Sequence, residues 1–445
     1  MGRDSVVGMG FDIHNAPIDA TSAQTLAEQG LRFDLLDDGD TTAYDFWLQA
    51  VTRGFHGPVL DADTLEARRN NFAHRRKSGV WDAASPDPQT PVATASGWVT
   101  ELTVPGTRAV DAWAISTISV APTHRRRAIA RNLMEAELRE AQSLGVPVAI
   151  LTASEATIYT RFGFAPSAQI ATWKFDTTRA KWVGPTAPGR VSIVPIENIR
   201  DGDGPALLER LRLGLPGQIR FDGMLWNRLF GIPGNPEAKE LRVVRYDDEA
   251  GQLQGFAVYR IAREPHFEAG AELNYFLTAT DDAYGALWRY LLELDLVSSV
   301  TAEMRLIDEP VYWQVSDPRA AKKVDESDHL WTRILDVKAA LEARTYNAPG
   351  SIILEVDDPL GYATGRYLLD IAADGAASVT VDNSPIGDVN GLALGVAELG
   401  AIYLGGVKAS TLAQAGRIRE LSPGSALAAD ASFRSARVPW LSIWF

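Results

Sequence analysis

Cysteine is absent from the 445-residue chain. Without thiols the protein has no disulfide, no cysteine-ligated zinc, no thiolate nucleophile and no covalent acyl-cysteine intermediate. Such a chain suits a reducing compartment, so we expect a cytoplasmic location. Histidine is also scarce, and the six histidines are scattered without the spacing of metal ligands, so no metal site is expected.

Long apolar runs are missing as well. No stretch approaches the roughly 20 apolar residues of a membrane-spanning helix, and residues 1–20 lack the apolar core of a signal peptide. The net charge of −14 repels a polyanion, so we expect no nucleic-acid partner. The same charge mildly favours cationic ligands such as amines.

The residues present are those of a multidomain globular protein. Apolar residues make up 46% of the chain, which at this length suggests about three domains. Two prolines and two glycines within residues 184–189 predict a domain boundary, since neither a helix nor a central strand continues through them. Beyond this boundary strand and helix patterns alternate, which indicates the α/β (α+β) class. The predicted strands are 241–246, 255–261, 351–356, 366–371 and 377–381, and the predicted helices are 206–213 and 284–294.

The Ala/Leu/Gly-rich segment 389–396 has two interpretations. It is predicted mainly as a helix that packs against a sheet, and alternatively as the lining of an apolar ligand pocket.

Residues 115–144 predict a strand, a basic turn and a helix in succession. Residues 115–120 alternate as a strand does, Pro122 ends that strand, and the helix after the turn extends to about Leu144. Its apolar face and its polar positions follow the helical spacing. The apolar face is Ile129, Leu133, Met134 and Leu138, and the polar positions are Arg131, Glu135, Glu137 and Arg139.

The basic turn before this helix predicts a phosphate site. The free amides of a first helical turn carry roughly half a positive charge and bind phosphate oxygens. Small side chains at Ala128 and Ala130 leave that backbone accessible. A solvated basic helix start is the alternative.

Tyr159 is the candidate general acid. It follows a buried-strand pattern at 146–151, within the run Ile158-Tyr-Thr-Arg-Phe-Gly-Phe164. A phenol with a pKa of about 10 is protonated at neutral pH and can give its proton to a thiolate with a pKa of roughly 8.5. A core tyrosine bonded to a backbone group is the alternative.

These segments together resemble the GNAT acetyltransferase superfamily. Arg125-x-x-Ala128-x-Ala130 resembles its pyrophosphate loop, with Ala128 in place of the usual glycine, and Tyr159-x-x-x-Gly163-Phe164 resembles its closing motif. The resemblance implies acetyl-CoA as cosubstrate, bound where two strands part. The implied contact residues are Ile118, Ser119, Val120, Arg125, Arg126, Arg127, Ala128, Ile129, Ala130, Arg131, Ser154 and Glu155.

A closer resemblance is to the enhanced intracellular survival (Eis) family of actinobacterial acetyltransferases. It is carried by Val120-Ala-Pro-Thr-His-Arg-Arg-Arg127, Ala153-Ser-Glu155, Leu330-Trp331, Ala339-Ala-Leu-Glu-Ala-Arg344 and Tyr403-Leu-Gly-Gly406. The family implies tandem GNAT-like domains, each a mixed sheet with flanking helices, then a sterol-carrier-like α+β domain, assembled as a hexamer. We assign 1–186 to the catalytic GNAT domain, 187–327 to a non-catalytic GNAT-like domain and 328–445 to the sterol-carrier-like domain.

The resemblance also assigns the proton transfers. Tyr159 is the implied general acid, and the terminal carboxylate of Phe445 is the implied general base, folded back into the first domain. A carboxylate with a reference pKa of about 3.5 is a weak base, so it needs desolvation or a bridging water. Independently, Asp281 and Asp282 follow a predicted strand of the second domain, where two carboxylates would repel a pyrophosphate.

The predicted activity is acetyl transfer to primary amines of a small cationic acceptor, of the aminoglycoside or polyamine type. With no cysteine, direct transfer in a ternary complex is expected. Two alternatives stay open: protein lysines as acceptors, and a non-catalytic scaffold that binds an apolar ligand. The family's acidic and aromatic pocket residues have no assigned position around residues 54–57.

Overall fold

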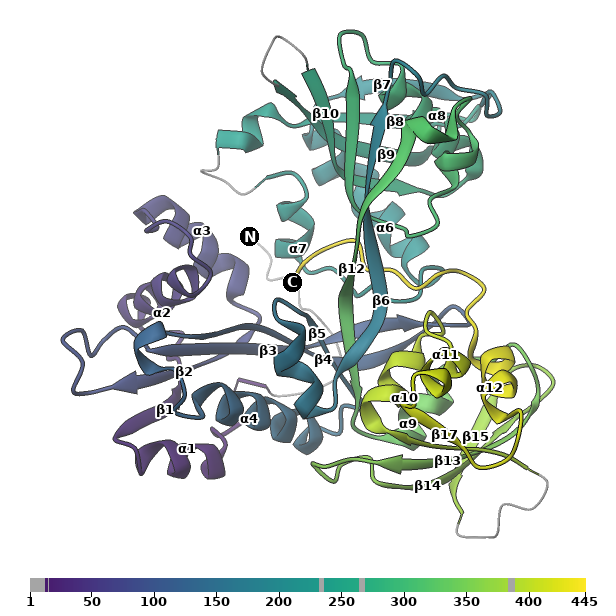
Figure 1. Ribbon diagram of the computed structural model, residues 1–445. Helices are drawn as coiled ribbons and strands as arrows, with labels where there is room; N and C mark the ends of the chain where they lie inside the picture. The colour runs from purple at the N-terminus through teal and green to yellow at the C-terminus, as the bar shows by residue number, and fades with distance from the viewer. Residues whose placement is uncertain (1–12, 15, 232–235, 264–268, 383–388) are drawn as a thin grey trace.

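The alternating and helical patterns build two β-sheets in the computed structural model, which describes residues 13–14, 16–231, 236–263, 269–382 and 389–445. Twelve strands join in one sheet, in the order β1-β2-β3-β4-β5-β12-β6-β11-β10-β9-β8-β7. Five strands form the second sheet, in the order β15-β14-β13-β16-β17. Figure 1 shows three lobes, with β6 and β12 running as a long pair from the lower to the upper part.

The first lobe has helices on both sides of β1 to β5. Its elements are α1 (Ala20–Ala27), β1 (Leu31–Leu35), α2 (Thr41–Gly54), α3 (Ala62–Phe72), β2 (Arg76–Asp82), β3 (Ala93–Val104), β4 (Arg108–Val120), α4 (Ile129–Ser143), β5 (Val148–Thr152), α5 (Ala156–Tyr159) and β6 (Ala165–Asp176).

The second lobe repeats the mixed-sheet pattern. Its elements are β7 (Arg190–Val194), α6 (Gly204–Arg212), α7 (Gly223–Arg228), β8 (Arg242–Asp247), β9 (Leu253–Arg263), β10 (Ala269–Thr278), α8 (Asp281–Leu292), β11 (Ser299–Arg305) and β12 (Ala321–Ile334).

The third lobe carries the smaller sheet. Its elements are α9 (Val337–Ala343), β13 (Gly350–Asp357), β14 (Gly365–Ile371), β15 (Ala377–Val381), β16 (Asn390–Gly395), α10 (Val396–Tyr403), α11 (Ala409–Gln414), β17 (Ile418–Glu420) and α12 (Ser425–Phe433).

β12 ties the lobes together. Its residues 321–332 pair with β6 and its residues 330–334 pair with β5, so it separates these two strands of the first lobe. It also crosses the predicted boundary at 327/328, and the domain boundaries stay predictions. The buried helix α10 packs on both β6 and β12, which places one apolar core across all three lobes.

Two local predictions were wrong. Residues 390–395, expected as a helix, form strand β16, because buried Leu392 and Leu394 alternate with small residues at the period of a strand. Glu137, expected at a polar position of its helix, is only 2% exposed and accepts a hydrogen bond from Trp113 Nε1 at 2.9 Å. This burial raises the pKa of Glu137 to about 7, while Arg76 and the Trp113 bond oppose the rise.

Among the described helices, none has the length and apolar character needed to cross a bilayer.

Candidate active site

The site begins where β4 and β5 part. They pair in parallel at only three positions, from Ala112 with Val148 to Ala114 with Ile150. β4 continues to Val120, paired along this stretch with β3. Thr117 adopts a left-handed φ of 54° at a bulge in that pairing, and its carbonyl accepts the Thr94 hydroxyl at 2.8 Å. The predicted parting of the strands is confirmed, and one edge of β4 near Ile118 faces away from any described strand.

The basic turn presents its backbone at the start of α4. Arg126 and Ala128 both have left-handed φ values, 64° and 56°. The first turn of α4 has no side-chain cap, so its amide groups have no side-chain acceptor. Among the described residues Arg125 and Arg126 form no ion pair and are exposed, whereas Arg127 donates to the Gln29 carbonyl at 2.8 Å.

The equivalent helix start in the second lobe is closed. The Thr280 hydroxyl caps α8 by accepting from the Ala283 amide at 3.1 Å. Asp281 and Asp282 add two carboxylates to that first turn. This helix start therefore offers no anion site.

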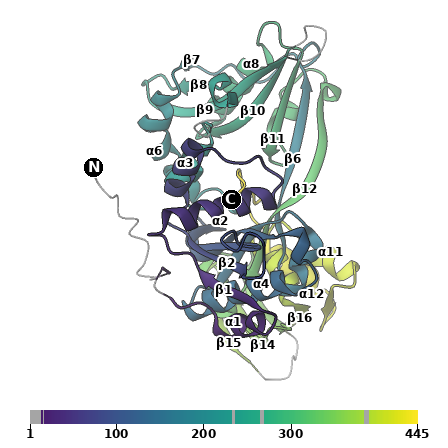
Figure 2. The same ribbon diagram turned by 90° about the vertical axis from the view of Figure 1, so that its left-hand side faces the viewer.

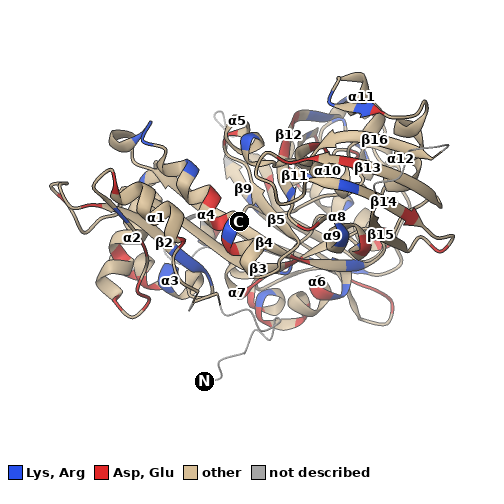
Figure 3. Cartoon of the chain, turned by 90° about the horizontal axis from the view of Figure 1, so that it is seen from below, with Lys and Arg blue, Asp and Glu red and all other residues tan. Residues whose placement is uncertain are grey.

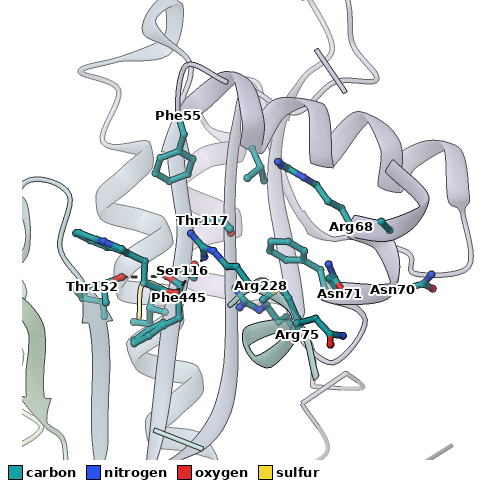
Figure 4. Close-up of a pocket in the computed structure, with 18 of the residues that line it drawn as sticks. Phe55, Arg68, Asn70, Asn71, Arg75, Ser116, Thr117, Thr152, Arg228 and Phe445 are labelled. Carbon is teal, nitrogen blue, oxygen red and sulfur yellow. Dashed lines mark hydrogen bonds between the residues drawn. The ribbon is translucent and has the colours of Figure 1, made fainter. Parts of the chain in front are cut away.

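Tyr159 and Phe445 line one cavity of about 750 Å³. Figure 4 shows this cavity with Phe445 labelled. α5 positions Tyr159, which is 7% exposed and packs edge-on against Phe164 and Trp331. Burial raises the pKa of Tyr159 above its ordinary value and the charge of Glu155 raises it further, whereas a hydrogen bond with Ser154 lowers it. The phenol is thus protonated at neutral pH.

The last residue of the chain is anchored on β5. The main-chain oxygen of Phe445 accepts a hydrogen bond from the Thr152 hydroxyl at 3.2 Å, a bond drawn in Figure 4. The Phe445 ring lies edge-on to Trp98, with ring centroids 5.5 Å apart, and the residue is 9% exposed. Figures 1 and 2 both place the chain end at the centre of the molecule, where the lobes meet.

The irregular segment 435–445 is held along its length. Trp440 Nε1 donates to the Met304 carbonyl at 2.8 Å, and the Arg228 side chain donates to the Trp444 carbonyl at 3.3 Å. His329 Nε2 lies 2.7 Å from the Ile443 carbonyl, which fixes that nitrogen as the protonated one. Burial lowers the pKa of His329 to about 4, so the ring is neutral at pH 7.

The predicted residues therefore divide into two groups. The cavity is lined by Ile118, Ser154, Tyr159 and Phe445. The remaining predicted residues lie along the end of β4, the basic turn, the start of α4 and the residue before α5: Ser119, Val120, Arg125, Arg126, Arg127, Ala128, Ile129, Ala130, Arg131 and Glu155.

Sequence reasoning missed the opposite wall of the cavity. It carries Phe55, Arg68 and Arg75 from the first lobe and Arg228 from α7 of the second lobe. A basic run around residues 68–77 was the available local signal. Arg228 had none, because it reaches the cavity only through the packing of the two lobes.

Known families and proteins match most of the chain. Residues 38–167 and 217–334 each match the sequence profile of the acetyltransferase (GNAT) domain, and residues 337–442 match that of the sterol carrier protein domain. An N-acetyltransferase of Streptomyces avermitilis is 35% identical over 408 residues, which cover 88% of this chain and 94% of the relative. N-acetyltransferase Eis of Mycobacterium tuberculosis is 33% identical over 345 residues, covering 75% and 81%.

The crystal structure of Eis1 from Mycobacterium abscessus superposes with a TM-score of 0.78 at 28% identity, covering 93% of this chain and all of that one. A GCN5-related N-acetyltransferase from Kribbella flavida, at 22% identity and a TM-score of 0.72, shares the fold.

Proposed function

The chain belongs to the Eis family of GNAT N-acetyltransferases, and from this premise we propose that it transfers the acetyl group of acetyl-CoA to a primary amine in the cavity between Tyr159 and Phe445. The observation that carries the proposal is that Tyr159, whose phenol is protonated, and Phe445 line one cavity where β4 and β5 part. When an amine attacks a thioester, a base is needed to take a proton from the amine and an acid is needed to protonate the leaving thiolate.

The residues at the end of β4 fit the cosubstrate. The uncapped amides of α4, with Ala128 beside them, provide donors for a pyrophosphate, and Arg125 and Arg126 are free to approach its charge. The free edge of β4 at Ile118 provides backbone groups for an extended amide-bearing arm. Acetyl-CoA supplies a thioester, an acyl donor that already carries a good leaving group.

The chain's own groups would then move the protons. The Phe445 carboxylate accepts a proton from the acceptor amine, and its burial supplies the desolvation that such a weak base needs. The Tyr159 hydroxyl gives its proton to the leaving thiolate of CoA. Its raised pKa keeps the phenol protonated until the thiolate leaves. Transfer is direct, within a ternary complex, since the chain has no cysteine to carry an acyl group.

One substitution and one C-terminal extension test the proposal. Tyr159→Phe should lower kcat by about 10²- to 10⁴-fold, the usual contribution of a positioned acid, with the Kd for acetyl-CoA unchanged. Tyr367→Phe on β14, outside the cavity, is the matched control and should leave kcat unaltered.

A residue added after Phe445 should abolish turnover while the melting temperature stays near that of an N-terminally extended protein. Full activity after C-terminal extension would remove the carboxylate from the mechanism.

Each of the two alternative functions has its own test. Protein lysines as acceptors predict acetylated peptides by mass spectrometry with purified enzyme and acetyl-CoA. A non-catalytic scaffold predicts no turnover of any amine. Assembly as a hexamer and a cytoplasmic location stay predictions, and light scattering of the purified protein tests the first.

A further inference from the structure

Arg75 differs from every other buried arginine in the described part of the chain. Arg212 and Arg333 bind carboxylates of Glu209 and Asp358, and Arg344 binds backbone carbonyls. Arg76 and Arg305 likewise have carbonyl and carboxylate acceptors. Arg75 is 1% exposed, yet its Nε and Nη2 are buried without a hydrogen-bond partner.

The Arg75 guanidinium is held in place by aromatic rings. It lies 3.9 Å from the ring centroid of Trp98 and 4.7 Å from that of Phe72. Asp222 is the nearby carboxylate, and its charge raises the pKa of Arg75 against the stronger effect of desolvation, but no hydrogen bond joins the two. One oxygen of Asp222 caps α7, and the other lies 2.9 Å from His74 Nε2. A charge so buried and so poorly paired is costly, which is typical of a group kept for a ligand.

Two more guanidiniums join Arg75 at this wall. Arg68 donates to the Thr52 hydroxyl at 2.9 Å, and Arg228 donates to the Trp444 carbonyl at 3.3 Å, but neither has a carboxylate partner among the described residues. Figure 4 shows all three on the cavity, from α3, from the residue before β2 and from α7. Their charges act on one another. Desolvation lowers the pKa of Arg228, and the positive charge of Arg68 lowers it further.

The acidic groups of the cavity do not balance these cations. Asp201 is bound by both Nε and Nη2 of Arg200, at 2.9 and 2.8 Å, so this pair is neutral by itself. Among the described residues that line the cavity, the Phe445 carboxylate is then the only acidic group left. The chain as a whole has a net charge of −14, with acidic and basic segments interspersed in Figure 3, so the cluster is a local feature.

We infer that the acceptor is a primary amine that also carries an anionic group, a carboxylate or a phosphate, which Arg68, Arg75 and Arg228 bind. Guanidinium groups recognise both anions through paired hydrogen bonds. The amine of such an acceptor would then lie toward Tyr159 and Phe445. A polyamine or aminoglycoside, the acceptor predicted from the sequence, would place its extra cations against three guanidiniums that form no salt bridge with any described residue. This inference rests on the proposed function.

The test is a set of amines with one skeleton, titrated by calorimetry into the full-length protein. The probes are 4-(aminomethyl)benzoate, its phosphonate analogue, its neutral carboxamide and p-xylylenediamine. We expect at least one anionic probe to bind about tenfold or more tightly than the carboxamide, and the diamine to bind weakest. Comparing the Kd values of the carboxylate and phosphonate probes then shows which of the two anions the site prefers.

Arg68→Gln and Arg228→Gln should each raise the Kd of the preferred anionic probe about tenfold or more and leave that of the carboxamide unchanged. They suit the test because neither side chain is fully buried, unlike Arg75. Arg210→Gln on α6 removes the same charge from an exposed site outside the cavity and is the matched control. Equal affinities for all probes, or tightest binding of the diamine, would overturn the inference.

Turnover of the same probes separates the two proposals. Acetylation of the diamine in preference to the anionic probes would leave the proposed function standing and remove this inference. Anion-selective binding that depends on Arg68 and Arg228, with no acetylation of any probe, would support the anion site and contradict the proposed function.

Discussion

Ala128 is the one residue of the pyrophosphate-type turn that departs from the family pattern, and its backbone explains what the departure costs. Its φ of 56° and ψ of 15° lie in the left-handed region, which glycine adopts freely. For a residue with a side chain, the left-handed conformation is less stable than the right-handed one by roughly 1–2 kcal/mol. The turn is therefore retained with some strain, as is common where a backbone must face a ligand.

Ala128→Gly should accordingly stabilise the protein by about 1 kcal/mol in urea unfolding. Ala130→Gly is the control, because Ala130 lies within α4, where glycine is less stable than alanine by up to about 1 kcal/mol. The two substitutions should thus shift stability in opposite directions. A loss of stability at position 128 as large as that at position 130 would show that the turn is not strained.

Among single residues, the sequence signals are clearest where a motif is contiguous. Tyr159 and the basic turn belong to such motifs and lie beside the parting strands, and their roles stay predictions. The prediction that Glu137 is solvent-exposed was wrong, because helical spacing alone does not reveal the hydrogen-bond donor, Trp113 Nε1, on a neighbouring strand. The sequence does not distinguish Arg75 from the other basic residues around it, such as Arg76, because its lack of an acceptor depends on two aromatic rings that fold around it.

At the scale of elements, predictions held where the period is clear. The strands predicted at 241–246, 366–371 and 377–381 match β8, β14 and β15 to within one residue at each end. β12 was not foreseen, because residues 321–328 are mostly charged and are exposed or half-buried for much of their length. Its strand conformation follows from pairing with β6, which is a tertiary contact.

The terminal segment 435–445 is the element whose position decides catalysis in the proposed mechanism. His329→Phe keeps a buried ring but removes the bond to the Ile443 carbonyl. Losing one buried hydrogen bond weakens docking by about 1–3 kcal/mol. We therefore expect a lower kcat, and release of Phe445 by a carboxypeptidase about tenfold faster than from the parent protein, followed by intact mass.

Burial of the same ring predicts a pH dependence. The folded-state pKa of His329 is about 4, below the unfolded value of 6.5, because burial disfavours the charged ring, while the bond to the Ile443 carbonyl opposes this shift. The neutral, buried ring therefore contributes stability that is fully present above pH 6.5 and is lost as the pH falls toward 4. Release of Phe445 from the parent should accelerate over this window, whereas His329→Phe should show a flatter profile. Identical profiles for the two proteins would mean that His329 does not hold the segment.

At the scale of the whole molecule, the first lobe is incomplete without the rest of the chain. β5 and β6 are separated by β12, and the cavity requires Arg228 and Phe445 from the other lobes. The local sequence predicts the order of the lobes but not this insertion, since strand order is set by contacts far apart in the chain. One apolar core shared by all three lobes follows from it.

A split at 186/187, in the irregular segment after β6, tests this dependence. Residues 1–186 expressed alone leave the facing edges of β5 and β6 unpaired, so we expect no cooperative unfolding transition by circular dichroism and no acetyl transfer. Co-expression with residues 187–445 returns β12 and the terminal carboxylate, and should restore both. Cooperative unfolding of residues 1–186 alone would show that β12 is dispensable for the fold, and turnover by that fragment would show that the carboxylate is dispensable for the reaction.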